Sequence, residues 1–231
     1  MDTLTLPVTK PKAVVAWSSG KDCSYALLTA HRSGDYDIVG LFTTTNEAFD
    51  RVAMHGTRNA VLQRQAQALG LDLISVPLPW PCTNEDYEDR MQTATAELLK
   101  RGVELVIFGD LFLEDVRAYR EKQLEGSGIR PVFPIWGEPT DQLARKMIAE
   151  GFDIRVVTCD PSRLDPSFAG RRLDEAFLQD LPAAIDSCGE NGEFHTAVVD
   201  MPMFRAPIPV TWGEHVIRDG FAYADLIPAD A

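Results

Sequence analysis

The chain has 231 residues, of which 35 are acidic and 22 are basic, so its formal net charge is −13. A surface this acidic repels a nucleic-acid backbone, and no basic patch interrupts it, which argues against nucleic acid as the main partner. Hydrophobic residues make up 45% of the chain and charged residues 25%, which is typical of a globular protein with a sizeable core.

The four cysteines, at positions 23, 82, 159 and 188, are widely spaced and form no Cys-x-x-Cys pair. This pattern favours reduced thiols over a disulfide framework or a zinc site. The N-terminus lacks the features of a signal peptide, and no apolar run is long enough to span a membrane. We therefore expect a cytoplasmic protein without a membrane partner. Its oligomeric state is left open, a homo-oligomer included.

The first half of the chain alternates short apolar runs with amphipathic stretches, which predicts strands and helices in turn. The predicted strands cover 13–17, 37–44, 71–76 and 103–108, and the predicted helices cover 24–33, 58–69 and 85–100. Strands and helices at this spacing predict an α/β fold with an open, mostly parallel sheet and helices on both faces.

The character of the sequence changes after about residue 128, where prolines become frequent. A predicted helix at 140–150, a predicted strand at 153–158 and a β-prone run at 196–199 follow. We predict a first domain over residues 1–130 and a smaller mixed α/β domain over residues 131–231.

A loop of small residues, Ser18-Ser19-Gly20, follows the first predicted strand and is continued by Lys21 and Asp22. In an open parallel sheet, ligands bind outside the carboxyl ends of the strands, where this loop falls. Small side chains let a phosphate approach the backbone, and the N-terminus of the next helix favours an anion. Lys21 would add positive charge, and Asp22 would hold a magnesium ion or an adjacent group. A tight turn with a helix cap fits the same residues.

A second segment of interest runs from Asp186 to Thr196. Its glycines and Asn191 suit a loop with unusual backbone angles, and Glu190, Glu193 and His195 come together within six positions. Two carboxylates and an imidazole at this spacing suit proton transfer or substrate binding. A solvated turn that enters a strand is the alternative.

Three further positions have two interpretations each. Asp110, after the fourth predicted strand, is a candidate for contact with magnesium or substrate, or a helix cap. Arg117 lies at helical spacing from Glu114 and Glu121, which fits a solvated face or a pocket where arginine neutralises a carboxylate. The segment His55-Gly56-Thr57-Arg58 would cap the next helix or reach a nucleotide.

The loop resembles the PP-loop, Ser-Gly-Gly-x-Asp-Ser, of the adenine nucleotide alpha-hydrolase superfamily, whose members cleave ATP between its α and β phosphates. The match covers Ser18 to Asp22, with Ser19 in place of the first glycine. It departs at Cys23, where the motif has serine, and Ser24 follows. Cys23 is then either a buried or helix-capping thiol or a reactive thiolate.

Residues 188–196 resemble the signature Cys-Gly-Glu-x-Gly-Glu-[Phe/Tyr]-x-Thr of the diphthine–ammonia ligase family. The resemblance extends over most of the chain, including Phe108-Gly109-Asp110 and Phe168-Ala169-Gly170-Arg171. His195 and the His-Gly-Thr segment are similar to the shorter branch of this family found in bacteria. Bacteria do not make diphthamide, so the acceptor is left open between a small carboxylate and a protein side chain.

The resemblance implies a Rossmann-like, HUP-type nucleotide-binding domain followed by an acceptor-substrate domain. It implies a ligase that adenylates a carboxylate with ATP, releases pyrophosphate and lets ammonia attack. ATP contacts are implied for Ser18, Ser19, Gly20, Lys21, Asp22, Cys23 and Ser24. Catalytic roles are implied for Asp22, Glu190 and Glu193, and substrate contacts for Asp110, Arg117, Asn191, Gly192 and His195. Mg²⁺ is implied with ATP, and the carboxylates that would hold it are left open.

Two other functions are compatible with the loop. A PP-loop tRNA sulfurtransferase would need a paired catalytic cysteine and a basic RNA surface, whereas this chain has scattered cysteines and a net charge of −13. A nucleotide-binding regulator would bind ATP without releasing pyrophosphate.

Overall fold

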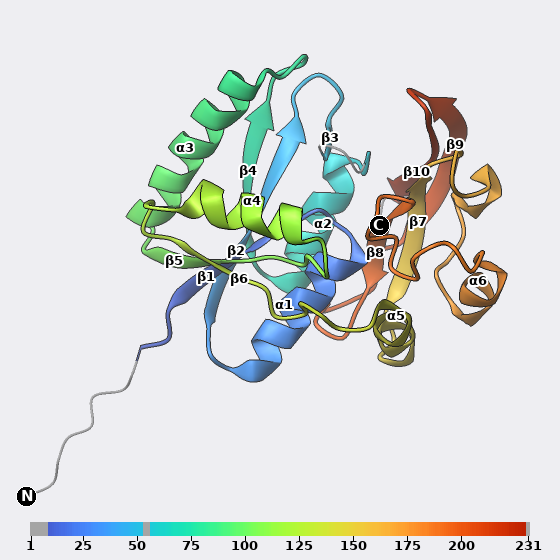
Figure 1. The fold of residues 1–231 in the computed structure, drawn as a ribbon, viewed down its shortest axis with the longest axis horizontal. Helices are drawn as coiled ribbons and strands as arrows, with labels where there is room; N and C mark the ends of the chain where they lie inside the picture. Colours follow the sequence, from blue (N-terminus) through green and yellow to red (C-terminus); the bar gives the residue numbers. More distant parts are fainter. Residues whose placement is uncertain (1–8, 53–55, 230–231) are drawn as a thin grey trace, which may run out of the picture.

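The computed structural model describes residues 9–52 and 56–229, which form two β-sheets with their helices (Figure 1). The first sheet contains β1 (Lys12–Ala16), β2 (Asp37–Asn46), β3 (Arg51–Val52), β4 (Asp72–Leu78), β5 (Val103–Ile107) and β6 (Arg130–Val132). Its helices are α1 (Lys21–Ser33), α2 (Asn59–Leu69), α3 (Asn84–Lys100) and α4 (Glu114–Leu124). The second sheet contains β7 (Asp153–Cys159), β8 (Phe194–Asp200), β9 (Val210–Arg218) and β10 (Phe221–Pro228), with α5 (Thr140–Ala149), η1 (Pro166–Phe168) and α6 (Glu175–Asp180).

The parallel strands of the first sheet lie in the order β4-β2-β1-β5-β6, and the short β3 pairs antiparallel with the end of β2. The chain moves outward from β1 to β4 and then crosses through α3 to β5, on the other side of β1. The strand order therefore reverses between β1 and β5. A reversal of this kind opens a crevice at the carboxyl ends of the two strands, which is the usual ligand site of such sheets.

Helices cover both faces of this sheet, so its strands are buried on both sides. Ala13 and Val15 of β1 belong to the core formed with α1 and α2, whereas Val14 belongs to the core formed with α3. This burial explains why β1 reads as a continuous apolar run rather than an alternating one. The predicted α/β fold, with an open, mostly parallel sheet and helices on both faces, is confirmed.

The second sheet is antiparallel throughout, in the order β8-β7-β10-β9. It shares one continuous hydrophobic core with α1 and α2 of the first sheet. Tyr25 of α1 packs on Phe152 with ring centroids 5.7 Å apart, and its hydroxyl donates to Glu150 over 3.1 Å. Helix α1 therefore lies between the two sheets and belongs to the packing of both.

The structure corrects the start of the first helix. We predicted that it begins at Ser24, but α1 begins at Lys21, because Gly20 is the last residue with extended backbone angles. The Ser24 hydroxyl donates to the Gly20 carbonyl over 2.7 Å, which adds a side-chain hydrogen bond to the first helical turn. Asp22 and Cys23 consequently lie in the first helical turn rather than in the loop.

All four cysteines are free, in agreement with the prediction of reduced thiols. Within residues 9–52 and 56–229, no helix combines the length and the apolar character needed to cross a membrane.

Gly109 is predicted to tolerate no side chain. It lies two residues after the end of β5 and packs against the backbone at the start of α1. A Cβ at this position would lie 2.6 Å from the Asp22 carbonyl carbon and 2.6 Å from the Cys23 nitrogen, which are backbone atoms that cannot rotate away. We expect Gly109→Ala to lower the free energy of unfolding by roughly 1–3 kcal/mol, as overpacking does. Urea unfolding measures this change. A loss smaller than about 0.5 kcal/mol would show that the two segments separate easily.

Candidate functional site

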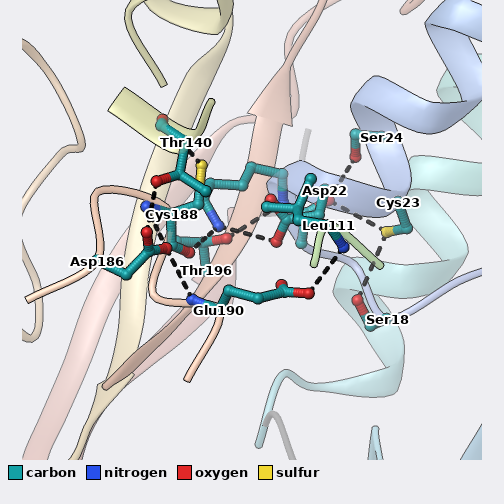
Figure 2. Close-up of polar contacts among 12 residues, drawn as sticks. Ser18, Asp22, Cys23, Ser24, Leu111, Thr140, Asp186, Cys188, Glu190 and Thr196 are labelled. Carbon is teal, nitrogen blue, oxygen red and sulfur yellow. Dashed lines mark hydrogen bonds and ion pairs between the residues drawn. The ribbon is translucent and has the colours of Figure 1, made fainter. Parts of the chain in front are cut away.

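Three segments meet at the carboxyl edge of the first sheet (Figure 2). The loop after β1 and the first turn of α1 supply residues 18–24, the end of β5 leads to residues 109–111, and the third segment, 186–196, runs into β8. The third segment reaches the second: the Leu111 N–H donates to the Glu190 carboxylate over 2.8 Å. The switch point between β1 and β5 is therefore completed by residues from the other sheet.

The loop adopts an unusual conformation at Ser19. Its φ is 74°, in the left-handed region that favours glycine, and its side chain is fully buried. A non-glycine residue there costs on the order of 1–3 kcal/mol, which the surrounding structure must offset. The Ser19 hydroxyl donates to the Thr57 hydroxyl over 3.0 Å, and the Ser19 carbonyl accepts from the Val198 N–H over 3.0 Å. This explains why a serine can stand where the PP-loop motif has glycine.

Lys21 points its ammonium into the protein and toward the third segment. The side chain is 2% exposed, and its Nζ donates to Asp22 Oδ2 over 2.8 Å and to the Cys188 carbonyl. The backbone N–H of Lys21 donates to the Thr196 hydroxyl over 3.1 Å, and the ammonium lies 5.5 Å from the centre of the Phe194 ring. Burial is the largest single effect and opposes the charge on Lys21, but the charge of Asp22, its hydrogen bond to the ammonium, and contributions from Cys188 and Glu190 together raise the pKa of Lys21 above its ordinary value. Lys21 is therefore a buried cation that ties the two halves of the site together.

Three carboxyl groups lie around the switch point, of which Asp22 pairs with Lys21 and Asp110 with Arg120. Burial raises the pKa of Asp22, against the opposing effect of Lys21, and burial likewise raises the pKa of Asp110. Burial also raises the pKa of Glu190, to about 7, and the negative charge of Asp22 adds to this increase. Glu190 is consequently balanced between its charged and neutral forms near neutral pH, a condition that suits proton transfer.

Two of these groups have buried oxygens without a hydrogen-bond partner among the described residues, namely Asp22 Oδ1 and Asp110 Oδ2. Arg120 Nε lies 3.6 Å from Asp110 Oδ2, an ion pair that is too long for a hydrogen bond. The described residues bring together no group of three or more His, Cys, Asp or Glu side chains suited to a metal ion. Mg²⁺ commonly binds through one or two carboxylates plus substrate phosphates, so Asp22 and Asp110 fit as its partial ligands.

Asp186 organises the third segment, a role that the sequence analysis missed. Its Oδ1 accepts from the N–H groups of Cys188 (3.0 Å) and Glu190 (3.1 Å), and the Thr140 hydroxyl donates to its Oδ2. Aspartate side chains that accept from backbone N–H groups a few residues later are a common way to shape a turn. An aspartate at the first position of this glycine-containing segment could therefore have predicted that its side chain shapes the turn.

Glu193 is fully buried at the base of this segment. Its Oε1 accepts from Asn191 Nδ2 over 3.2 Å and lies 3.8 Å from Arg163 Nη2, whereas its Oε2 has no hydrogen-bond partner among the described residues. Gly192, between Asn191 and Glu193, has a φ of 84°, an angle that glycine adopts freely. Glu193 thus lies beneath the segment, and Glu190 lies on the side that faces the loop.

His195 is part of β8, where it pairs with Thr158 of β7. Burial and, to a smaller extent, the positive charge of Lys21 together lower the pKa of His195 to about 4, so its imidazole is neutral at pH 7. The structure thus places a neutral imidazole one residue after Phe194, whose ring lies beside the buried ammonium.

Arg117 is occupied elsewhere. Its guanidinium lies 4.8 Å from the ring centres of both Phe133 and Trp136, and its Nε donates to Glu121 over 2.9 Å. The neighbouring Arg120 is the arginine that approaches Asp110. Of the segment 55–58, His55 lies outside the described residues, whereas Thr57 reaches the loop through Ser19.

Cys23 is a buried thiol at the start of α1. Its Sγ donates to the Gly20 carbonyl over 3.1 Å, and the Ser18 hydroxyl lies 3.5 Å from the sulfur. Burial raises the pKa of Cys23, so the neutral thiol is favoured over a thiolate. The environment of Cys23 therefore fits a buried thiol rather than a reactive thiolate.

These features define a class of protein: an open parallel α/β sheet with a loop of small residues at its switch point, closed by an acidic segment that leads into a second sheet. Sequence comparison gives the family. Residues 11–131 match the diphthamide synthase N-terminal domain, and residues 139–226 match the diphthamide synthase C-terminal domain. The chain therefore belongs to the diphthamide synthase family.

Curated relatives carry the name diphthine–ammonia ligase. The proteins of Rattus norvegicus and Homo sapiens are each 27% identical to this chain over 150 residues, which cover 63% of this chain and 56% of each relative. The chain thus matches little more than half the length of these two relatives. The protein of Bos taurus is 23% identical over 231 residues, which cover 90% of this chain and 86% of that protein.

The raised pKa of Glu190 predicts a pH-dependent gain of stability in Glu190→Gln. A carboxyl whose pKa rises on folding stabilises the native state below its unfolded pKa, and this stability is lost as pH rises through the folded value of about 7. Glutamine keeps an acceptor for the Leu111 N–H but never ionises. We expect the variant to exceed wild type in unfolding free energy by on the order of 1 kcal/mol at about pH 8, and by much less at about pH 5.

Urea unfolding at the two pH values measures the difference. Glu121→Gln, on the exposed face of α4, is the matched control and should show no such pH dependence. An equal difference at both pH values would mean that Glu190 titrates near its ordinary pKa.

Proposed function

We propose that this protein is an ATP-dependent ligase that activates a carboxylate as an acyl-adenylate and transfers it to ammonia. The observation that carries the proposal is the arrangement of Asp22, Asp110 and Glu190 around the small-residue loop that begins at Ser18, at the switch point. Membership of the diphthamide synthase family and relatives named diphthine–ammonia ligase support it.

The nucleotide phosphates would bind at residues 18–24. The small side chains of Ser18, Ser19 and Gly20 leave the backbone accessible, and the N-terminus of α1 supplies a favourable dipole. Asp22 and Asp110, with their buried oxygens that lack hydrogen-bond partners, would hold Mg²⁺ together with the phosphates. The ion would neutralise phosphate charge in a site that already contains several carboxylates.

The reaction would proceed in two displacements. An oxygen of the acceptor carboxylate attacks the α-phosphorus, the bond from this phosphorus to the bridging oxygen breaks, and pyrophosphate leaves. The nitrogen of ammonia then attacks the acyl carbon, the bond to the AMP oxygen breaks, and AMP leaves with the electron pair. A proton must leave the nitrogen, and Glu190 is suited to accept it because its pKa lies near 7.

The acceptor would bind on the side of the site formed by the second sheet. We propose a division into a nucleotide-binding domain (1–130) and an acceptor domain (131–231), with Asn191, Gly192 and His195 on the acceptor side and Asp110 between the two. Arg117 is left out of the site, because its guanidinium packs on Phe133 and Trp136 and its Nε donates to Glu121. The acceptor carries a carboxylate and is either a small molecule or a protein side chain. The free cysteines support a cytoplasmic location, and the net charge of −13 argues against nucleic acid as a partner.

The proposal predicts pyrophosphate release that requires both an acceptor carboxylate and ATP. We expect wild type to release pyrophosphate when a panel of carboxylic acids is screened with ATP, Mg²⁺ and ammonia. Asp22→Asn keeps the shape of the side chain but removes its charge, so it should weaken ATP binding in the presence of Mg²⁺ at least tenfold. Calorimetry measures the binding. ATP binding without turnover of any acceptor would favour a nucleotide-binding regulator, and unchanged affinity in Asp22→Asn would contradict the placement of the phosphates.

Glu193→Gln is predicted to separate product formation from nucleotide binding. The residue lies at the base of the segment 186–196, away from the loop, and the substitution replaces a buried carboxyl group that lies 3.8 Å from Arg163 Nη2. We expect amide formation to fall at least tenfold while ATP affinity changes less than twofold. Glu121→Gln is the control and should change neither quantity. A parallel loss of ATP affinity in Glu193→Gln would instead assign this segment to the nucleotide site.

A further inference from the structure

Gln65 is a buried side chain that neither the loop motif nor the acidic segment includes. It lies on α2 with no solvent exposure, and each polar atom of its amide has a partner. Its Oε1 accepts from the Trp17 indole N–H over 2.8 Å. Its Nε2 donates to the Ser19 carbonyl over 2.9 Å and to the Val198 carbonyl over 2.8 Å.

These three partners come from the two sheets. Trp17 and Ser19 follow β1 in the first sheet, whereas Val198 is part of β8 in the second. The indole donor accepts no hydrogen bond, so it fixes which end of the amide is the oxygen and directs both amide hydrogens to the carbonyls. Buried amides with every partner in place hold their neighbours rigidly, and the loss of one leaves several polar groups unsatisfied.

The hydrogen bond to Ser19 has a consequence for the loop. Ser19 occupies the left-handed region at φ 74°, and its carbonyl accepts from both Gln65 and the Val198 N–H. The only cis peptide bond of the described residues is Trp80–Pro81, so the peptide between Ser19 and Gly20 is planar and trans. In such a peptide, the N–H points opposite to the carbonyl. Holding the Ser19 carbonyl toward α2 and β8 therefore directs the Gly20 N–H to the opposite side.

We propose that Gln65 is a positioning residue for the nucleotide: by holding the Ser19 carbonyl, it orients the Gly20 N–H as a donor to a phosphate of ATP. This inference rests on the proposed function, because it takes ATP as the ligand of the loop. Gln65 does not touch the nucleotide itself. It also fastens β8 to the loop, so the nucleotide side and the acceptor side of the site keep a constant relation.

Gln65→Met tests the proposal, since methionine has a similar length but neither donates nor accepts in the same way. Leu62→Ala is the matched control, because Leu62 is also fully buried on α2 but makes no hydrogen bond to the loop. We expect ATP affinity, measured by calorimetry with Mg²⁺, to fall at least tenfold in Gln65→Met. It should stay within twofold in Leu62→Ala at a temperature where both variants are folded, even where the control has the lower Tm.

The outcomes separate the possibilities. Folded Gln65→Met that binds ATP within twofold of wild type overturns the inference but leaves the proposed function intact. An equal loss of affinity in both variants also overturns it, because Gln65 would then act only through stability. Wild type that binds no ATP removes the proposed function and this inference together.

If Gln65→Met does not fold, Trp17→Phe tests the same amide. It removes the indole donor that orients Gln65 and keeps an aromatic ring in the core. We expect a loss of ATP affinity of at least threefold in this variant. Unchanged affinity would overturn the inference.

Discussion

Hydrogen bonds between the loop at residues 18–21 and strand β8 hold the two sheets together at the candidate site. The Lys21 N–H donates to the Thr196 hydroxyl, 175 positions away in the chain, and the Val198 N–H donates to the Ser19 carbonyl. The loop therefore takes part of its backbone hydrogen bonding from the other sheet. Because buried backbone groups must be paired, the first sheet alone does not satisfy this loop. The two sheets are consequently joined into one folded unit at this loop.

The charges of the site follow from this attachment. Lys21 is buried between the loop and the second sheet, and burial raises the pKa of Asp22, Asp110 and Glu190. These three carboxyl groups share two cations, the Lys21 ammonium and the more exposed Arg120 guanidinium. An arrangement with this excess of acid favours a further cation, and it keeps at least one carboxyl able to exchange a proton near neutral pH. Both properties suit a reaction that brings together a nucleotide, a carboxylate and an amine.

The topology explains why these groups meet at all. The order β4-β2-β1-β5-β6 places the ends of β1 and β5 side by side, and Gly109 lets the backbone after β5 approach the first turn of α1. The segment before β8 then closes the crevice through Glu190 and Leu111. A family with this loop normally has glycine at the position of Ser19. Here the hydroxyl of Thr57 and two donors to the Ser19 carbonyl stabilise the same backbone shape with a serine.

The parallel α/β sheet with helices on both faces is predictable from the sequence, because buried strands and amphipathic helices leave local hydrophobic patterns that need no tertiary information. Likewise, the motifs at 18–24 and 188–196 identified the family, since each is contiguous. The hairpin of β9 and β10 was not predicted, because Gly213, Glu214 and His215 interrupt the apolar residues of β9, and the sequence of β10 is almost continuously apolar rather than alternating. Three findings depend on tertiary packing: the Lys21 side chain points inward, Glu190 rather than Glu193 faces the loop, and Gln65 joins the two sheets. These are contacts between residues far apart in the chain, set by how the sheets pack, and no local pattern encodes them.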